Sequence, residues 1–186
     1  MIRDCGEADF AAIFEIINDA AQAYRGVIPA DRYHQPYMQV DELADEIAAG
    51  VRFRGAKAPV EAGGADGGPK LAGVMGLQDM DANPGWDGPP VCLIRHAYVR
   101  TVFQRSGIGG AILEDIKGRA RRPLLVGTWA AASWAVEFYI RHGFRQVEAD
   151  EKDRLLHTYW EIPERQVETS VVLAGPTWPA PSGRRQ

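Results

Sequence analysis

Cysteine is scarce in this chain, and long apolar runs are missing from it. Cys5 and Cys92 are the only cysteines among the 186 residues, one near the start and one in a run typical of a strand. This spacing does not indicate a disulfide framework, so we expect a reducing, cytoplasmic setting. No apolar run approaches the roughly 20 residues that a membrane span needs, and MIRDCGEADF at the start lacks the apolar stretch of a signal peptide. We therefore expect no membrane partner.

An excess of positive charge is also missing. The net charge is −4, so long-range electrostatics gives no general attraction to nucleic acid. The sequence contains four scattered histidines, which are His34, His96, His142 and His157. Their spacing is not that of metal ligands, and we expect no metal site.

What the chain does contain is enough apolar sequence for one core. Hydrophobic residues make up 46% of it, and its length favours one domain. We expect that domain to span residues 1–174. The remaining residues, 175–186, read GPTWPAPSGRRQ, and a stretch so rich in Pro and Gly predicts a flexible tail.

Helical and strand patterns alternate along the chain. A helix is expected over residues 8–24, and a second one, capped by Asp41 with Leu43 and Ile47 facing inward, is expected to end at Gly50. The other expected helices cover residues 108–120, 132–142 and 153–160, and the expected strands cover residues 51–58, 70–78, 91–99, 123–130, 144–149 and 166–174. Loops rich in Gly and Pro are expected at residues 61–69 and 81–90. The class is therefore α/β or α+β, built on a mixed sheet.

Residues 102–113, VFQRSGIGGAIL, place three glycines between a strand and a helix. The phosphate loop of nucleoside triphosphatases is excluded, because Ala111 follows the last glycine where a Lys is needed. The dinucleotide fingerprint fits weakly, because the glycines lie far from the strand and the next strand ends without an acid. A third interpretation, the pattern Q/R-x-x-G-x-G/A, fits from Gln104 to Gly109. Helix N-terminal N–H groups there favour a pyrophosphate.

This motif resembles the acetyl-CoA site of the GNAT superfamily of N-acyltransferases. A second stretch, AVEFYIRHGF at residues 135–144, is similar to the A-x-x-F-Y-x-x-x-G-F signature of the same superfamily. The resemblance extends over residues 1–162 in layout and is specific over residues 99–144. It implies a twisted, mostly antiparallel mixed sheet flanked by helices, with a bulged fourth strand splayed from the fifth, and acetyl-CoA as cosubstrate.

The resemblance also implies roles for residues of this chain. The acetyl-CoA contacts carried over by position are Tyr98, Val99, Arg100, Gln104, Arg105, Ser106, Gly107, Ile108, Gly109 and Gly110. Ser133 stands beside Ala132, where the family often has Asn, and is expected to replace that polar contact. Tyr139 has the position of the general acid. Leu93 stands where many members carry a Glu base, so His96 is either the base or a structural histidine, and a water-relayed base stays open.

An aromatic and cationic stretch near the N-terminus is the expected acceptor site. Its residues are Tyr24, Arg25, Arg32 and Tyr33, with Tyr37 close by. Arginines beside aromatics suit a carboxylate or phosphate on the acceptor. The expected reaction is direct acetyl transfer to a small-molecule or peptide amine, and a homodimer is compatible with it. A non-catalytic acyl-CoA sensor and a nucleotide-binding module of another α/β class are the alternatives.

Overall fold

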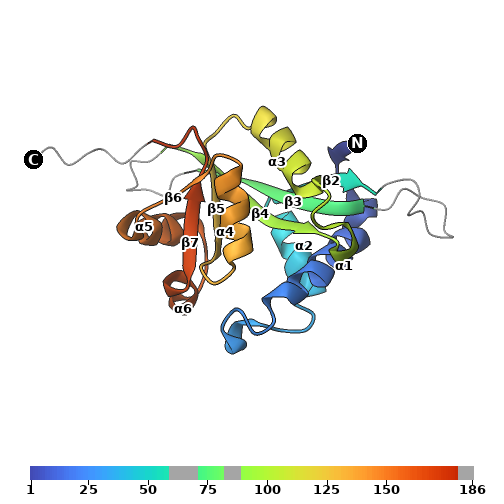
Figure 1. Cartoon of the computed structure of the whole chain (residues 1–186), viewed down its shortest axis with the longest axis horizontal. Helices are drawn as coiled ribbons and strands as arrows, with labels where there is room; N and C mark the ends of the chain where they lie inside the picture. The colour runs from blue at the N-terminus through green and yellow to red at the C-terminus, as the bar shows by residue number, and fades with distance from the viewer. Residues whose placement is uncertain (59–70, 82–88, 180–186) are drawn as a thin grey trace, which may run out of the picture. The chain divides into compact units, whose positions relative to one another are not determined.

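The computed structural model describes residues 1–58, 71–81 and 89–179, and these form two compact units (Figure 1). Of the described residues, the N-terminal unit contains 1–58, 71–79 and 94–119, and the C-terminal unit contains 80–81, 89–93 and 120–179. Strand β4, Val91–Val99, contributes its first residues to the C-terminal unit and the rest to the N-terminal unit.

The strands are hydrogen-bonded in the order β1-β2-β3-β4-β5-β7-β6. The sheet is mostly antiparallel, β4 and β5 form a parallel pair, and helices flank the strands. This confirms the predicted α/β class with a mixed sheet. The splay between β4 and β5 and the domain boundaries stay predictions.

The N-terminal unit is built around three antiparallel strands. They are β1 (Ile2–Asp4), β2 (Arg52–Lys57) and β3 (Leu71–Met80), with β2 between the other two. Helices α1 (Phe10–Ala20) and α2 (Val40–Ala48) lie on one side of these strands, and α3 (Ile108–Arg119) lies on the other (Figure 1). The core side of α1 carries Ile13, Ile16 and Ile17, whose spacing of three and four residues places them on one helical face.

The helix expected to be capped by Asp41 differs from the prediction in two respects. Helix α2 begins at Val40, and its N-cap is Gln39, whose backbone N–H donates to Glu42 Oε2 at 3.3 Å. Asp41 therefore lies inside the first turn, where an acid is favoured by the helix dipole. Leu43 is buried as expected, but Ile47 is 38% exposed, because it lies just before the end of the helix.

The C-terminal unit pairs β7 with two antiparallel neighbours. Strand β7 (Ser170–Ala174) lies between β5 (Leu124–Trp129) and the two-residue β6 (Arg145–Gln146). The helices of this unit are α4 (Ser133–Arg141), α5 (Ala149–Tyr159) and α6 (Glu164–Glu168). The predicted strand 144–149 is thus mostly not a strand, since α5 already begins at Ala149 after the N-cap Glu148.

The predicted strand 166–174 is correct only in its second half. Residues 164–168 form helix α6, which follows Pro163 at the N-cap, where the fixed φ of proline suits a helix start. Strand β1 was missed, because three residues are too few to show an alternating pattern. Trp178, in the expected tail, is 8% exposed and donates from Nε1 to Glu151 Oε1 at 2.8 Å, so packed structure continues beyond residue 174.

The remaining expectations concern two loops, membrane-spanning helices, metal sites and a disulfide. The expected loop 61–69 and residues 82–88 of the expected loop 81–90 lie outside the described residues. Within residues 1–58, 71–81 and 89–179, no helix is both long and apolar enough to cross a membrane. The same ranges hold no group of three His, Cys, Asp or Glu side chains that could bind a metal ion. Cys5 and Cys92 do not form a disulfide.

Candidate functional site

Strand β4 is deformed at His96. The φ angle of His96 is 49°, in the left-handed region that residues other than glycine rarely adopt, so the strand alternation is interrupted there. Gly76 on β3 accommodates the neighbouring carbonyl, because a Cβ on Gly76 would lie only 2.9 Å from the Arg95 carbonyl oxygen. His96 is therefore placed by a backbone irregularity and not by simple strand alternation.

The side chain of His96 is held from two other elements. Its Nε2 lies 3.0 Å from Glu46 Oε2 on α2, and its ring stacks on Phe53 of β2 with a centroid distance of 6.0 Å. Arg95 Nη1 lies 3.0 Å from the same Glu46 oxygen and 3.0 Å from Gln78 Oε1. Sequence reasoning missed Glu46, because nothing in the local pattern of α2 distinguishes this mostly buried residue from the exposed acids Asp41, Glu42 and Asp45 of the same helix.

Two opposing effects act on the Glu46 carboxyl. Burial is the largest single cause and raises its pKa, but the hydrogen bond and charge of His96, together with Arg95, outweigh burial, so the pKa of Glu46 lies below its ordinary value. Because the pKa of Glu46 is lower in the folded than in the unfolded protein, its ionised carboxylate stabilises the fold at pH values above the ordinary pKa of Glu. That contribution is lost as the pH falls through the lowered value.

The glycine loop follows β4 through a short 3₁₀ turn, Thr101–Phe103. Arg105 has φ 60° and Gly107 has φ 84°, so two left-handed residues alternate with Ser106. In such an arrangement, successive backbone N–H groups point toward the same concave surface, which can bind an anion. The Ala111 N–H donates to the Gly107 carbonyl at 2.9 Å, which makes Gly107 the N-cap of α3 and leaves the N–H groups of its first turn without intrahelical acceptors.

The polar side chains predicted for this loop have different surroundings. Gln104 Nε2 donates to the Val99 carbonyl at 3.1 Å, and the Ser106 hydroxyl donates to the Phe103 carbonyl. Arg105 is exposed. Arg100 is held instead by α1 and β3, since its Nη2 lies 2.9 Å from Glu15 Oε2 and its Nε donates to the Leu71 carbonyl at 3.0 Å.

Gly73 on β3 allows α3 to approach the sheet closely. A Cβ on Gly73 would lie 3.0 Å from Val99 Cγ2, 3.1 Å from Ile108 Cγ2 and 3.1 Å from the Tyr98 carbonyl oxygen. Since Ile108 is the first residue of α3, this contact fixes the start of the helix relative to the end of β4.

We expect Gly73→Ala to lower the free energy of unfolding by about 1–3 kcal/mol, the usual cost of overpacking. Gly118→Ala is the matched control, because Gly118 is exposed on α3, the helix that approaches Gly73, and a Cβ there meets no atom within 4 Å. The control should be neutral or stabilising by up to about 1 kcal/mol. Urea unfolding of the three proteins measures both changes, and equal stability of the Gly73 variant and wild type would contradict the close approach.

Three tyrosines meet where the end of β4 faces the segment after α1. The Tyr24 and Tyr37 rings are 5.4 Å apart, and the Tyr24 and Tyr98 rings are 6.4 Å apart, edge to face. Burial, followed by the neighbouring Tyr24 and Tyr37 hydroxyls, raises the pKa of Tyr98 well above its ordinary value. Asn18 on α1 holds this segment in place through hydrogen bonds to Met38 N–H at 2.9 Å and to the Met38 carbonyl at 3.1 Å.

The rest of the predicted acceptor cluster lies around Tyr33. The Tyr33 ring is 6.2 Å from the Tyr37 ring, and the Arg25 guanidinium lies 5.9 Å over the Tyr33 ring, within the range of a cation–π contact. Arg32 ends the 3₁₀ turn Ala30–Arg32 directly before it. The structure therefore brings the predicted aromatic residues together, Tyr37 included, and places Tyr98 beside Tyr24.

The residues predicted on α4 belong to the C-terminal unit. Tyr139 is 3% exposed and packs between Phe138 and Phe144, at centroid distances of 5.1 and 5.4 Å. Ser133 is the first residue of α4 and is exposed. The N-cap of α4 is Ala132, which has no side-chain group to accept from the helix N–H groups.

Comparison with known proteins assigns these features to a family. A family model described as an acetyltransferase (GNAT) domain matches residues 64–160, which is more than half of the chain. The chain belongs to the GNAT acetyltransferase family. This confirms the resemblance seen in the sequence, and members of the family use acetyl-CoA.

Solved GNAT structures share the fold of this acetyltransferase. A GNAT-family acetyltransferase from Staphylococcus aureus Mu50 and a PaiA N-acetyltransferase from Thermoplasma acidophilum, in complex with coenzyme A, are each 16% identical with a TM-score of 0.61, covering 94% of this chain and 97% of theirs. A GNAT acetyltransferase from Streptococcus agalactiae 2603 is 12% identical with a TM-score of 0.64, covering 94% of both chains. No curated protein sequence matches the chain.

The glycine loop of this acetyltransferase is compatible with a bound pyrophosphate. A Cβ on Gly107 would meet no atom within 4 Å, so the space in front of the N-cap is open. The loop residues from Gln104 to Gly107 are exposed, and Arg105 adds a positive charge beside the first-turn N–H groups of α3. The chemistry of this cradle therefore fits the phosphates of coenzyme A.

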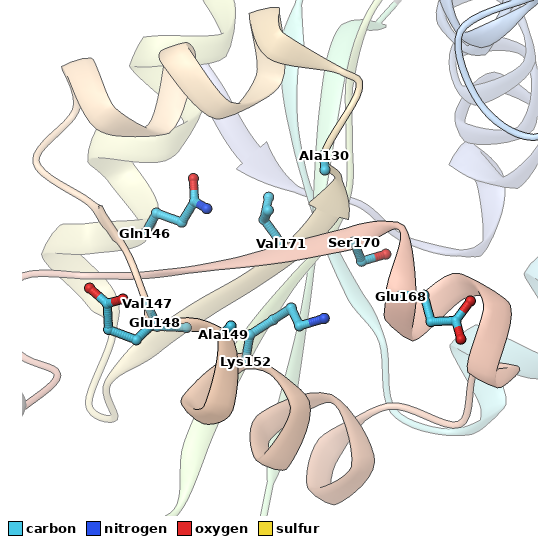
Figure 2. A pocket seen from close by; sticks show the side chains of 9 residues that line it. All are labelled: Ala130, Gln146, Val147, Glu148, Ala149, Lys152, Glu168, Ser170 and Val171. Carbon is cyan, nitrogen blue, oxygen red and sulfur yellow. The ribbon is translucent and has the colours of Figure 1, made fainter.

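A separate pocket of about 320 Å³ lies in the C-terminal unit of the acetyltransferase (Figure 2). Its lining residues are Ala130, Gln146, Val147, Glu148, Ala149, Lys152, Glu168, Ser170 and Val171. Lys152 reaches along it from α5, but its Nζ donates to the Val167 carbonyl at 2.9 Å and lies 2.6 Å from Asp153 Oδ1. The ammonium is thus already neutralised within this unit, and the pocket is not lined by any residue predicted for the site.

Proposed function

We propose that this protein transfers an acetyl group from acetyl-CoA directly to a primary amine, without an acyl-enzyme. The observation that carries the proposal is the loop from Arg105 to Gly107, in which left-handed Arg105 and Gly107 flank Ser106 directly before helix α3. Membership of the GNAT acetyltransferase family supplies the class of reaction.

In this proposal, backbone groups bind most of the cosubstrate. The N–H groups of Gly107, Ile108, Gly109 and Gly110 bind the pyrophosphate, and Arg105 adds charge to that contact. The family resemblance assigns Tyr98, Val99 and Ser133 to the thioester arm. Bound acetyl-CoA supplies an activated acyl group, and the protein positions that group and moves protons.

The proton transfers are assigned to two side chains. As the new C–N bond forms and the C–S bond breaks, the amine loses one proton and the leaving thiolate gains one. His96 accepts the first proton, because it is the titratable group at the deformed point of β4. Tyr139 donates the second, since it has the position of the family's general acid and a phenol is a suitable donor to a thiolate.

The acceptor is proposed to be a small-molecule or peptide amine that binds at Tyr24, Arg25, Arg32 and Tyr33. The stacking of Arg25 on Tyr33 supports a site that holds an acceptor by its aromatic faces and by charge. A cytoplasmic location, which two cysteines outside any disulfide favour, and a homodimer belong to the same proposal.

Two measurements on the wild-type protein test this function. Released CoA thiol is assayed with acetyl-CoA over a panel of polyamines, amino acids, aminoglycosides and peptides, and at least one amine class should give turnover. Thermal shift with CoA or NAD is measured in parallel, and only CoA should raise the melting temperature, because a ligand stabilises the form that binds it. Stabilisation by CoA without turnover would instead support the sensor alternative, and stabilisation by NAD alone would contradict the assignment of the loop.

A further inference from the structure

We propose that Glu46 is a positioning residue that fixes the tautomer of His96, so that Nδ1 is the atom that accepts the proton of the acceptor amine. This inference rests on the proposed function and assigns a role to a helix residue outside the predicted site. It follows from one contact: Glu46 Oε2 lies 3.0 Å from His96 Nε2, although the two residues are 50 positions apart.

The contact determines where the imidazole proton lies. An ionised carboxylate only accepts hydrogen bonds, so the nitrogen facing it must carry a proton. Glu46 is ionised, because the Arg95 guanidinium lies 3.0 Å from its Oε2 and an adjacent positive charge favours the carboxylate. Neutral His96 therefore carries its proton on Nε2, and Nδ1 keeps a lone pair.

The surroundings of the pair limit other arrangements. Both side chains are mostly buried, with 16% of His96 and 21% of Glu46 exposed. The groups that face them are Phe53 on β2, Gln78 on β3 and Arg95 on β4 itself. Arg95 donates to both Glu46 and Gln78, which in turn donates from Nε2 to the Ala49 carbonyl at 3.0 Å, so the carboxylate is anchored at the end of α2.

This anchoring gives Glu46 a role in the reaction step. When Nδ1 takes the proton from the amine, the ring becomes an imidazolium with both nitrogens protonated. The carboxylate of Glu46 is already in place to stabilise that cation without moving, which lowers the cost of the proton transfer. The proton later leaves Nδ1 to solvent, and Glu46 remains ionised throughout.

The test combines kinetics with nitrogen NMR. Glu46→Gln keeps the size of the side chain and removes its charge. We expect kcat to fall by about 10-fold, which is less than the ~10²-fold or more of a whole proton-transfer contribution because His96 itself is kept, and the acidic limb of the pH–rate profile to move to lower pH. The limb moves in that direction because the protonated ring has lost the carboxylate that favours it. Asp45→Asn is the matched control, since Asp45 is exposed on the same helix, and its profile should equal that of wild type.

The NMR measurement does not depend on activity. In wild-type protein, the ¹⁵N shifts of neutral His96 should show a protonated Nε2 and an unprotonated Nδ1, and the opposite assignment would overturn the proposal even if Glu46→Gln failed to fold. A folded Glu46→Gln protein with unchanged kcat and profile, beside an active wild type, would also overturn it. Failure of the proposed function looks different, because wild type would then acetylate none of the amines.

Discussion

Gly109→Glu should abolish CoA binding while leaving the fold intact. Gly109 is the second residue of α3, next to the left-handed Arg105–Gly107 loop that we propose as the pyrophosphate site. A glutamate there places a carboxylate where the phosphates bind, and the two anions repel each other. The fold should tolerate the change, because an acid in the first turn of a helix is favoured by the helix dipole. Isothermal titration calorimetry with CoA measures the loss of affinity.

Gly118→Glu provides the matched control for this experiment. It adds the same side chain to the same helix, but at an exposed position in the last turn, where a Cβ meets no atom within 4 Å. Its CoA affinity should stay close to that of wild type, although an acid at the helix C-terminus can cost up to about 1 kcal/mol of stability. If Gly109→Glu binds CoA as tightly as wild type does, the pyrophosphate site lies elsewhere.

Tyr139→Phe should lower kcat by about 10²-fold or more, which is the scale of assistance by a general acid. The substitution removes one oxygen and keeps the ring, so packing against Phe138 and Phe144 should change little. KM for acetyl-CoA should change much less than kcat, because the lost contact acts on the leaving thiolate. Steady-state kinetics at saturating amine measures both parameters.

Tyr159→Phe is the matched control in the same unit, because it shows what the loss of a buried tyrosine hydroxyl does to stability alone. Tyr159 is 3% exposed, as is Tyr139, and its hydroxyl donates to the Pro89 carbonyl at 3.2 Å. This control should lose about 1 kcal/mol of stability, the value of a typical hydrogen bond, and keep kcat. If Tyr139→Phe behaves in the same way and keeps more than half of the wild-type kcat, Tyr139 is structural and the general acid is another group.

The parts of the fold and site that the sequence predicts are those encoded within a short window. The glycine loop is one, because Arg105, Gly107 and the first turn of α3 follow each other directly. Helix α1 is another, since its buried isoleucines repeat at the helical period. Helix α6 was missed for the opposite reason. Its Val167 and the residues after it suit a strand locally, while Pro163 and the packing of Val167 in the core favour a helix.

Contacts between distant segments are what the sequence does not show. Glu46 meets His96 only because α2 packs beside β4, and the deformation at His96 is not visible in the run VCLIRHAYV. Arg100 stays a predicted cosubstrate residue, but its ion pair with Glu15 on α1, 85 positions away, has no local signal. Gly73 and Gly76 likewise have no local signal, since their importance comes from the neighbours that a Cβ would meet.

A single-turnover experiment tests the central claim most directly. Enzyme in excess is mixed with acetyl-CoA and an amine found by the panel, and the masses of the intact protein and of the amine are followed after rapid quenching. Direct transfer predicts that the acetyl group moves onto the amine at the rate at which CoA appears, with no acetylated protein at any time. An acetylated protein that forms first and then passes its acetyl group to the amine would contradict the account.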